Sequence, residues 1–160
     1  MSDEPIAIAI DFECKDVTKA LEKLKAHLKS RTVMDEIGFT VAKWGRARIK
    51  SRANQAPDGS TWESLAASTI KAKQNAGKGH MGTLMFEPKL MNSINHQVTS
   101  DDSVSIGSSM LYAMIHQEGG MAGRGRKVRI PARPYIGLSD KEKRLIEEKV
   151  VDWVKKILKQ

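Results

Sequence analysis

The chain has 160 residues, of which 40% are hydrophobic and 29% are charged, and its formal net charge is +8. These values suit one domain and exclude collagen-like, disulfide-dense and wholly disordered proteins. The longest apolar run, residues 6–10, is far shorter than the roughly 20 residues that span a membrane, and Cys14, the single cysteine, excludes an internal disulfide. The acidic N-terminus lacks a secretory signal, so a soluble protein, cytoplasmic where it is made, is expected.

The first thirty residues predict a strand and then a helix. Larger apolar residues alternate with small or acidic ones over residues 6–12, which is the period of a strand with one apolar face. Apolar residues then recur every three or four positions over residues 17–28, which predicts an amphipathic helix. Asp16 is placed to cap this helix.

A second helix is predicted from Thr32, because Asp35 stands three residues later as in a capping box. Apolar residues mark one face of this helix. Gly38 and Gly45, seven residues apart, lower its helix propensity and favour a close crossing with another helix.

The middle of the chain predicts short elements separated by turns. Residues 56–59 contain a proline and a glycine in the order that a tight turn requires. A short helix is predicted from residue 68 or 69, followed by a glycine-rich loop over residues 75–83. Pro88 suits the first turn of another short helix, and residues 95–107 predict a hairpin with two aspartates at its turn.

The last third of the chain predicts a mobile loop, a short strand and a long helix. Residues 119–127 are rich in glycine and arginine and show no apolar period, whereas residues 128–130 suit a strand. Residues 139–142 form a capping box that opens the C-terminal helix. The sequence therefore predicts a single α+β domain over residues 1–160, with a small antiparallel sheet packed against several helices and a long C-terminal helix.

A stiff connector is predicted before the C-terminal helix. Pro131 and Pro134 fix φ and disfavour helix at the residues that precede them. Such a connector holds Tyr135 against the core and aims the final helix from Ser139.

The positive charge is concentrated in two segments, residues 43–52 and 124–133. Together they carry ten Lys and Arg and no acidic residue, while the rest of the chain has 17 basic and 19 acidic residues. Clustered Lys and Arg indicate an anionic partner such as nucleic acid, and the alternative is a solvated helix face and a solvated loop. The candidate partner or anion contacts are Arg124, Arg126, Lys127 and Arg129.

Residues that carry catalytic or metal chemistry are not found in a recognisable pattern. The four histidines form no zinc-binding pair, and one cysteine cannot build a zinc cluster. Tyr112 and His116 are four residues apart, and a buried tyrosine beside a hydrogen-bonded histidine is the interpretation preferred to catalysis. A hydrolase with His116 as base lacks a placed nucleophile or carboxylate. We therefore expect no catalytic residue, metal or cofactor.

Several motifs occur in one order along the chain. Residues 57–69 fit the pattern P-D-G-x-x-W-x-x-L-x-x-x-T, and residues 90–94 fit L-x-x-S-I. Residues 112–120 read Y-A-M-I-H-Q-E-G-G, and residues 130–139 read I-P-A-R-P-Y-I-G-L-S. In these segments the chain resembles the phage virion morphogenesis family, the tail-completion proteins of Mu-like and related tailed phages.

The resemblance implies a structural protein rather than an enzyme. By analogy with tail terminators it implies a homo-oligomeric ring, expected to be a hexamer, that completes the tail at its head-proximal end. The implied partners are other copies of the chain and tail tube or head connector proteins, with DNA in the channel and no membrane. The implied location is the virion tail or neck, after assembly in the host cytoplasm. A small basic DNA-binding module is the alternative.

The motifs also supply candidate structural residues. A structural role is expected for Trp62, Tyr112, His116, Arg133, Pro134 and Tyr135.

Overall fold

The structure is a computed structural model that describes residue 19, residues 22–26 and residues 31–159. The strand predicted over residues 6–12 lies outside the described residues. Of the helix predicted over residues 17–28, the described residues are 19 and 22–26, and all of them are helical. In the part of the chain that is described, no helix is long and apolar enough to cross a membrane.

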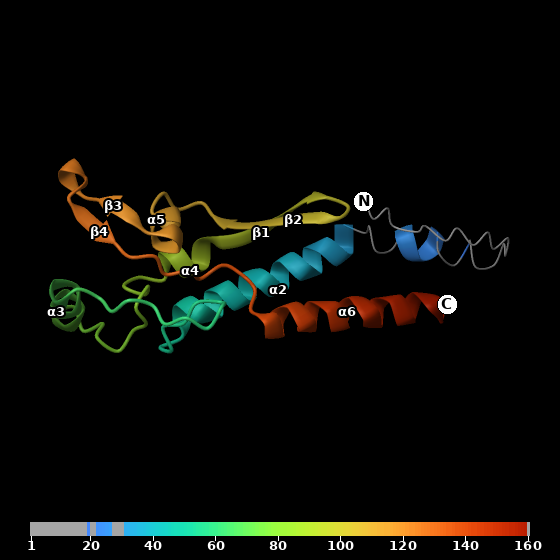
Figure 1. Ribbon diagram of the computed structural model, residues 1–160, viewed down its shortest axis with the longest axis horizontal. Coiled ribbons are helices and arrows are strands. Elements are labelled where there is room, and N and C mark those ends of the chain that lie inside the picture. The colour runs from blue at the N-terminus through green and yellow to red at the C-terminus, as the bar shows by residue number, and fades with distance from the viewer. Residues whose placement is uncertain (1–18, 20–21, 27–30, 160) are drawn as a thin grey trace, which may run out of the picture.

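The molecule is long and narrow, and its two ends are built differently (Figure 1). At one end, helix α2 (Arg31–Lys50) carries the hairpin of strands β1 (Ile94–Ser100) and β2 (Ser103–Ser108), and helix α6 (Asp140–Leu158) runs alongside. The predicted hairpin with its aspartate turn is therefore confirmed. So is the long C-terminal helix, because Ser139 and Glu142 form both bonds of the capping box, at 2.8 and 3.2 Å.

At the other end, helix α3 (Ala67–Asn75) lies opposite a second hairpin, formed by strands β3 (Gly120–Ala122) and β4 (Val128–Ile130). A 3-10 turn, η1 (Arg124–Arg126), joins the two strands. Short helices α4 (Lys89–Ser93) and α5 (Ala113–Glu118) lie between the two ends. The α+β class is confirmed, and the described residues form two separate two-stranded antiparallel sheets where one was predicted.

The segment predicted as a mobile loop, residues 119–127, contains β3 and η1. Its strand is only three residues long, too short for the alternation that marks a strand in a sequence. The glycines that indicated a loop are the residues that let the chain turn, since Gly123 and Gly125 have φ values of 77° and 72°. The mobility of this segment stays a prediction.

The inner face of the β1–β2 hairpin packs directly on α2. Side chains on this face alternate with fully exposed ones, as expected for a sheet covered on one side. Gly38 is the point of closest approach, because a Cβ there would lie 2.6 Å from both His96 Cδ2 and Val104 Cγ2. Gly38 therefore serves a strand–helix contact. A Cβ at Gly45 would lie 3.3 Å from the carbonyl oxygen of Tyr135 in the connector, so neither glycine serves the helix crossing that the sequence suggested.

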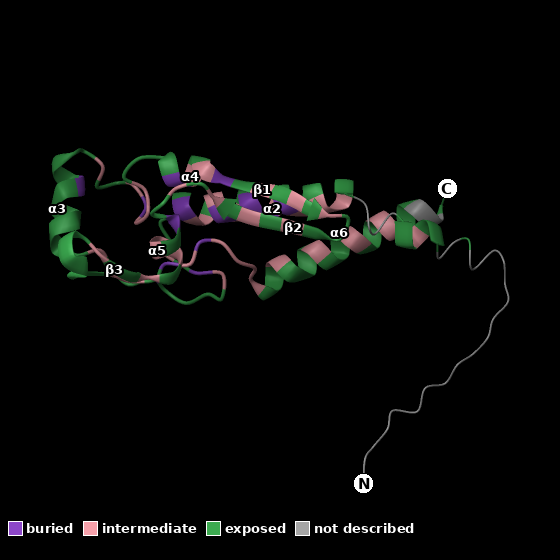
Figure 2. Cartoon of the chain, turned by 90° about the horizontal axis from the view of Figure 1, so that it is seen from above, coloured by how far each residue is buried: buried purple, intermediate pink, exposed green. Residues whose placement is uncertain are grey.

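The core lies in the middle of the molecule, where the buried segments gather in Figure 2. It joins α2, α4, α5 and the connector that precedes α6. Its members are Ala42, Ile49, Ala56, Trp62, Leu90, Ile94, Ala113 and Tyr135. Helix α6 stands apart from it, since none of the α6 side chains that the structure describes is buried.

A buried lysine organises the α3 end. The side chain of Lys73 is 4% exposed, and its Nζ donates hydrogen bonds to the carbonyl oxygens of Met81, Gly82 and Met85 at 3.2, 2.7 and 3.2 Å. Burial lowers the pKa of this amine. The sequence predicted a glycine-rich loop over residues 75–83. In the structure, the ammonium group of Lys73 binds carbonyl oxygens in this loop and just after it.

Candidate functional site

Four of the candidate structural residues meet in one place. The indole Nε1 of Trp62 donates to the carbonyl oxygen of Pro134 at 3.1 Å. The hydroxyl of Tyr135 donates to the carbonyl oxygen of Ala113 at 3.1 Å, and its ring is 1% exposed. The predicted burial of Tyr135 is therefore confirmed. The connector is fixed on both sides of Pro134.

Arg133 completes this arrangement as a buried cation held by carbonyl groups. Its guanidinium donates to the carbonyl oxygens of Glu63 at 3.0 and 3.1 Å and of Ser64 at 3.2 Å, and the residue is 4% exposed. Burial lowers the pKa of Arg133, and the nearby carboxylate of Glu63 opposes that shift. The group is thus a fixed donor that clamps the segment after Trp62, and is not available to an outside anion.

Gln117 is a functional residue that sequence reasoning missed. Its Oε1 accepts hydrogen bonds from the backbone N–H groups of Tyr135 and Ile136, both at 3.0 Å, and its Nε2 donates to the carbonyl of Ile136 at 2.8 Å. The amide side chain thereby makes the backbone hydrogen bonds that a neighbouring strand would otherwise make with the connector. The sequence signal for Gln117 is its place in the Y-A-x-I-H-Q motif, directly after His116. We call Trp62, Gln117, Arg133 and Tyr135 the central cluster.

Tyr112 and His116 do not form the predicted buried pair. Their rings meet edge to face with centroids 5.9 Å apart, but Tyr112 is 40% exposed. Tyr112 stands just before α5, and the next residue, Ala113, takes the buried position instead. The buried Nδ1 of His116 has no hydrogen-bond partner among the residues that the structure describes, and burial, followed by the charge of Arg133, lowers the pKa of its imidazole. In the described residues, no group of three or more His, Cys, Asp or Glu side chains could hold a metal ion.

The four candidate anion contacts separate into two groups. Arg129 forms an ion pair with Glu63, whose backbone carbonyl Arg133 holds, with Nη1 3.1 Å from Oε2. The other three lie at the turn of the β3–β4 hairpin, and their side chains are exposed and make no hydrogen bond or ion pair with the described residues. We call Arg124, Arg126 and Lys127 the basic tip.

In the first basic segment, residues 43–52, two of the five basic side chains make hydrogen bonds within the fold. Arg46 donates to the carbonyl oxygen of Ile94 at 2.7 and 3.2 Å. Arg48 donates to the carbonyl oxygens of Tyr135 and Gly137 and pairs with Glu142 at the start of α6. These two arginines hold elements together, so this segment is not the uniformly free basic face that its sequence allowed.

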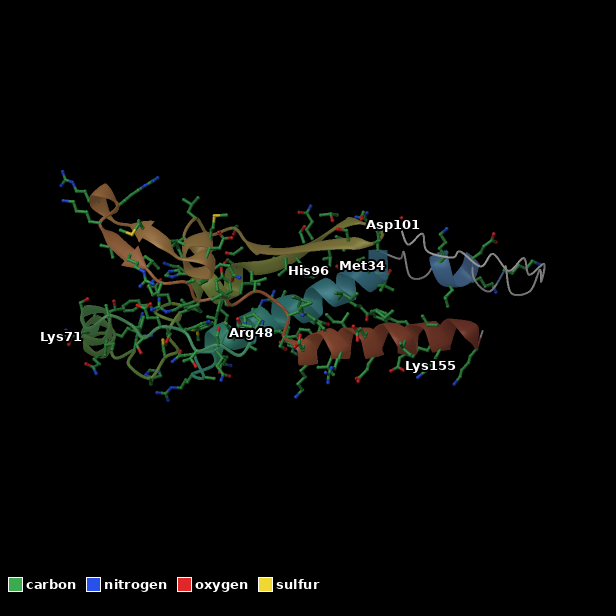
Figure 3. All side chains as sticks on the ribbon, viewed as in Figure 1. Met34, Arg48, Lys71, His96, Asp101 and Lys155 are labelled. Carbon is green, nitrogen blue, oxygen red and sulfur yellow. The ribbon has the colours of Figure 1, made fainter. Side chains whose placement is uncertain are left out.

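Charge and apolar exposure both distinguish the two ends of the molecule. Residues 51–93 and 111–134 carry ten Lys and Arg against four Asp and Glu, a net of +6 out of +8 for the chain. Figure 3 places Lys71 at this end and Asp101 at the opposite end, on the β1–β2 turn. Large apolar side chains are 50–102% exposed on the β3–β4 hairpin and on or just before α5: Met121, Val128, Met114 and Leu111.

Comparison with known proteins decides which family this arrangement belongs to. The model of the phage virion morphogenesis family matches residues 12–155. The chain belongs to this family. The resemblance seen in the motifs is confirmed, and the protein has a role in phage virion assembly.

Two relatives illustrate the range of similarity within the phage virion morphogenesis family. The chain is 33% identical over 151 residues to the putative capsid assembly protein G of Escherichia phage Mu, which covers 93% of this chain and 91% of that protein. It is 41% identical over 83 residues to the Mu-like prophage FluMu G protein 2 of Haemophilus influenzae, covering 51% of this chain but 59%, less than two thirds, of that protein. No solved structure matches the chain.

Membership of the phage virion morphogenesis family gives the motifs a physical meaning in this member. The tryptophan of the first motif, the glutamine of the third and the R-P-Y of the fourth are the residues that meet in the central cluster. The motifs therefore mark how the chain holds itself together.

Proposed function

We propose that this protein completes the phage tail at its head-proximal end. It does so as a structural protein without catalytic activity, in a homo-oligomeric ring at the head–tail junction, hexameric by analogy with tail terminators. The proposal rests on family membership and on one structural observation. The exposed apolar side chains are numerous in comparison with the buried apolar residues of the core.

The observation concerns side chains that a soluble monomer usually covers. Among the described residues, nine apolar residues are buried, whereas ten large hydrophobic side chains are exposed. Exposed apolar patches of this kind mark surfaces that other molecules cover. They lie at both ends of the molecule, with Phe39 on α2 and Val151 on α6 at one end and Met121 on β3 and Val128 on β4 at the other.

Two unlike surfaces at opposite ends favour a ring over a two-fold dimer. A two-fold dimer uses one surface twice, whereas a head-to-tail contact joins two different surfaces and closes into a ring when the rotation permits. The charge difference between the ends supports the same arrangement, because the strongly basic end of one copy is complementary to a less basic end of the next.

The expected partners beyond other copies are the tail tube and the head connector. The name of the phage Mu relative refers to capsid assembly, which is consistent with a position where tail and head meet. The basic tip is available for an acidic rim on a head protein or for DNA in the channel. The location of the protein is then the virion tail or neck, after assembly in the host cytoplasm.

Electron microscopy of isolated tails tests this function. Tails made with the protein should end in a density with rotational symmetry at the head-proximal end, and tails made without it should lack that density and fail to join heads. Tail ends that carry isolated copies of the protein without rotational symmetry would contradict the proposal.

The DNA-binding alternative is less well supported. Arg46, Arg48, Arg129 and Arg133 are already held by carbonyl or carboxylate groups. The logarithm of DNA affinity falls with the logarithm of salt concentration in proportion to the number of phosphates neutralised. A steep slope, together with tight binding by the isolated protein, would favour this alternative over the tail-end ring.

A further inference from the structure

The β3–β4 hairpin is an incomplete sheet. Each of its strands has three residues, and within the described chain each pairs only with the other, so each has one open edge. A two-stranded hairpin is marginally stable alone, and an open edge is a template for another strand. Met121 and Val128 on this hairpin are 50% and 54% exposed. An added strand would satisfy the edge and cover apolar surface at once.

The surroundings define the chemistry of that strand. Leu111, just before α5, is 102% exposed, and Met114, on α5, is 69% exposed. Helix α5 adjoins the hairpin, because a Cβ at Gly120 on β3 would lie 3.4 Å from Cγ1 of Ile115 on α5. The basic tip contributes three positive charges that make no ion pair with described residues. The complementary strand is therefore extended, apolar on one face and acidic.

One segment of the chain has this chemistry. Residues 1–16 contain five acidic residues and one lysine, and their larger apolar residues alternate over residues 6–12. This segment lies outside the described residues. It joins the described fold by way of the start of α2, at the end of the molecule away from β3–β4, and α2 alone is about 30 Å long. A neighbouring copy presents its hairpin more readily than the segment's own chain does.

We propose that residues 6–12 of one copy pair as an added strand with the open edge of the β3–β4 hairpin of the next copy. The acidic residues on either side of the strand lie against the basic tip, and its apolar side chains cover Val128 and the α5 surface. The contact joins two different surfaces, so it propagates from copy to copy. It rests on the self-association in the proposed function and names the segment that produces it.

A mixing experiment tests the proposal with two defective variants. The strand variant carries Ile8→Pro and Ile10→Pro, which block a strand ladder. The tip variant carries Arg124→Glu, Arg126→Glu and Lys127→Glu. Each variant alone should self-associate at least about tenfold more weakly than the wild-type chain. Their mixture should form one-to-one dimers and nothing larger, because it contains one intact strand and one intact hairpin.

A charge-matched control separates the tip from net charge. Lys141→Glu, Arg144→Glu and Lys156→Glu change the same charge at exposed positions of α6. This variant should self-associate at least as strongly as the wild type, because α6 lies at the less basic end. Light scattering after size exclusion measures each mass, and circular dichroism checks that each variant is folded. If the strand variant self-associates as the wild type does, or if the mixture forms no dimer, the proposal is overturned while the ring survives.

A peptide experiment remains decisive if the free protein is a monomer at every concentration. A fluorescent peptide of residues 1–16 should bind the strand variant saturably, and the tip substitutions should weaken binding about tenfold. Raising the salt from about 50 to about 500 mM should weaken it further, since surface charge pairs are screened. No binding at about 1 mM peptide overturns the proposal. Binding by the peptide together with tails that carry no ring would instead overturn the proposed function alone.

Discussion

The central cluster and the β3–β4 end are both rich in polar and basic groups, yet they use them in opposite ways. In the cluster, the Trp62 indole, the Tyr135 hydroxyl, the Gln117 amide and the Arg133 guanidinium all donate to backbone carbonyls. At the β3–β4 end, three cations of the basic tip have no partner in the described chain, and large apolar side chains face solvent. A region whose polar groups are hydrogen-bonded within the chain maintains the fold. A region with unpaired charges and exposed apolar side chains indicates where other molecules bind.

The largest effect is expected from truncating Tyr135 in the central cluster. Tyr135→Ala removes a ring that is 1% exposed together with its hydrogen bond to Ala113, so it should lower the free energy of unfolding by about 2–4 kcal/mol. Urea denaturation measures the change. Tyr112→Ala, at a 40% exposed ring, is the matched control and should cost less than about 1 kcal/mol. Similar losses in the two variants would contradict the distinction.

The second largest effect is expected at Lys73, outside the central cluster. It tests whether a buried cation that donates hydrogen bonds to backbone carbonyls stabilises the fold there as well. Lys73→Ala leaves three carbonyls of the following loop without their ammonium donor, so the free energy of unfolding should fall by about 1–3 kcal/mol. Lys71→Ala, at an exposed lysine of the same helix, should change it by less than about 0.5 kcal/mol. Equal stabilities of the two variants would show that the hydrogen bonds of Lys73 do not stabilise the fold.

A smaller effect concerns acid and His116, next to the central cluster. The unfolded chain binds a proton at this imidazole near pH 6.5, whereas burial lowers the pKa in the folded protein. The unfolded state therefore binds more protons in that interval, so the free energy of unfolding should fall as the pH drops from about 6.5 through the folded-state pKa.

Substitution at His116 is the measurement for this acid effect. Denaturation of His116→Gln between about pH 7.5 and pH 5 should show less of this loss than the wild type. His80→Gln, at an exposed position, should keep the wild-type pH dependence. A profile for His116→Gln that matches the wild type would contradict a role for burial.

The smallest effect on folding is expected at the basic tip. Replacement of Arg124, Arg126 and Lys127 by Ala removes charges that hold nothing within the described chain, so stability should change by less than about 0.5 kcal/mol. Head–tail joining in an assembly reaction should nevertheless fail at physiological salt. The matched Ala variant at Lys141, Arg144 and Lys156 should join normally. Unchanged joining by the tip variant would make the tip a solvated turn.

Local chemistry made some of the fold predictable. The capping box at Ser139 and the aspartate turn of the β1–β2 hairpin each depend on neighbours within a few residues. The two prolines indicated the connector, whereas the burial of Tyr135 also depends on the distant Ala113 and Gln117. The family resemblance was carried by motifs in the same way, because they record the contacts of the central cluster.

The remaining features depend on partners far away in the sequence. Arg46 and Arg48 look like surface charge, and only the positions of Ile94, Tyr135 and Gly137 reveal them as internal donors. The exposure of Tyr112 follows from Ala113 taking the buried site at the start of α5. Strands as short as β3 and β4 are fixed by tertiary contacts rather than by a sequence period.

Methionine oxidation tests most directly whether the β3–β4 end is the surface that assembly covers. Met114 and Met121 are 69% and 50% exposed, so mild peroxide should convert both to sulfoxides in the free protein. In purified tails, mass spectrometry should find both side chains protected, whereas the hydrogen bonds and buried groups of the central cluster need no partner molecule to form. Equal oxidation of Met114 and Met121 in free protein and in tails would contradict the account, because it would leave this end of the molecule uncovered in the assembled particle.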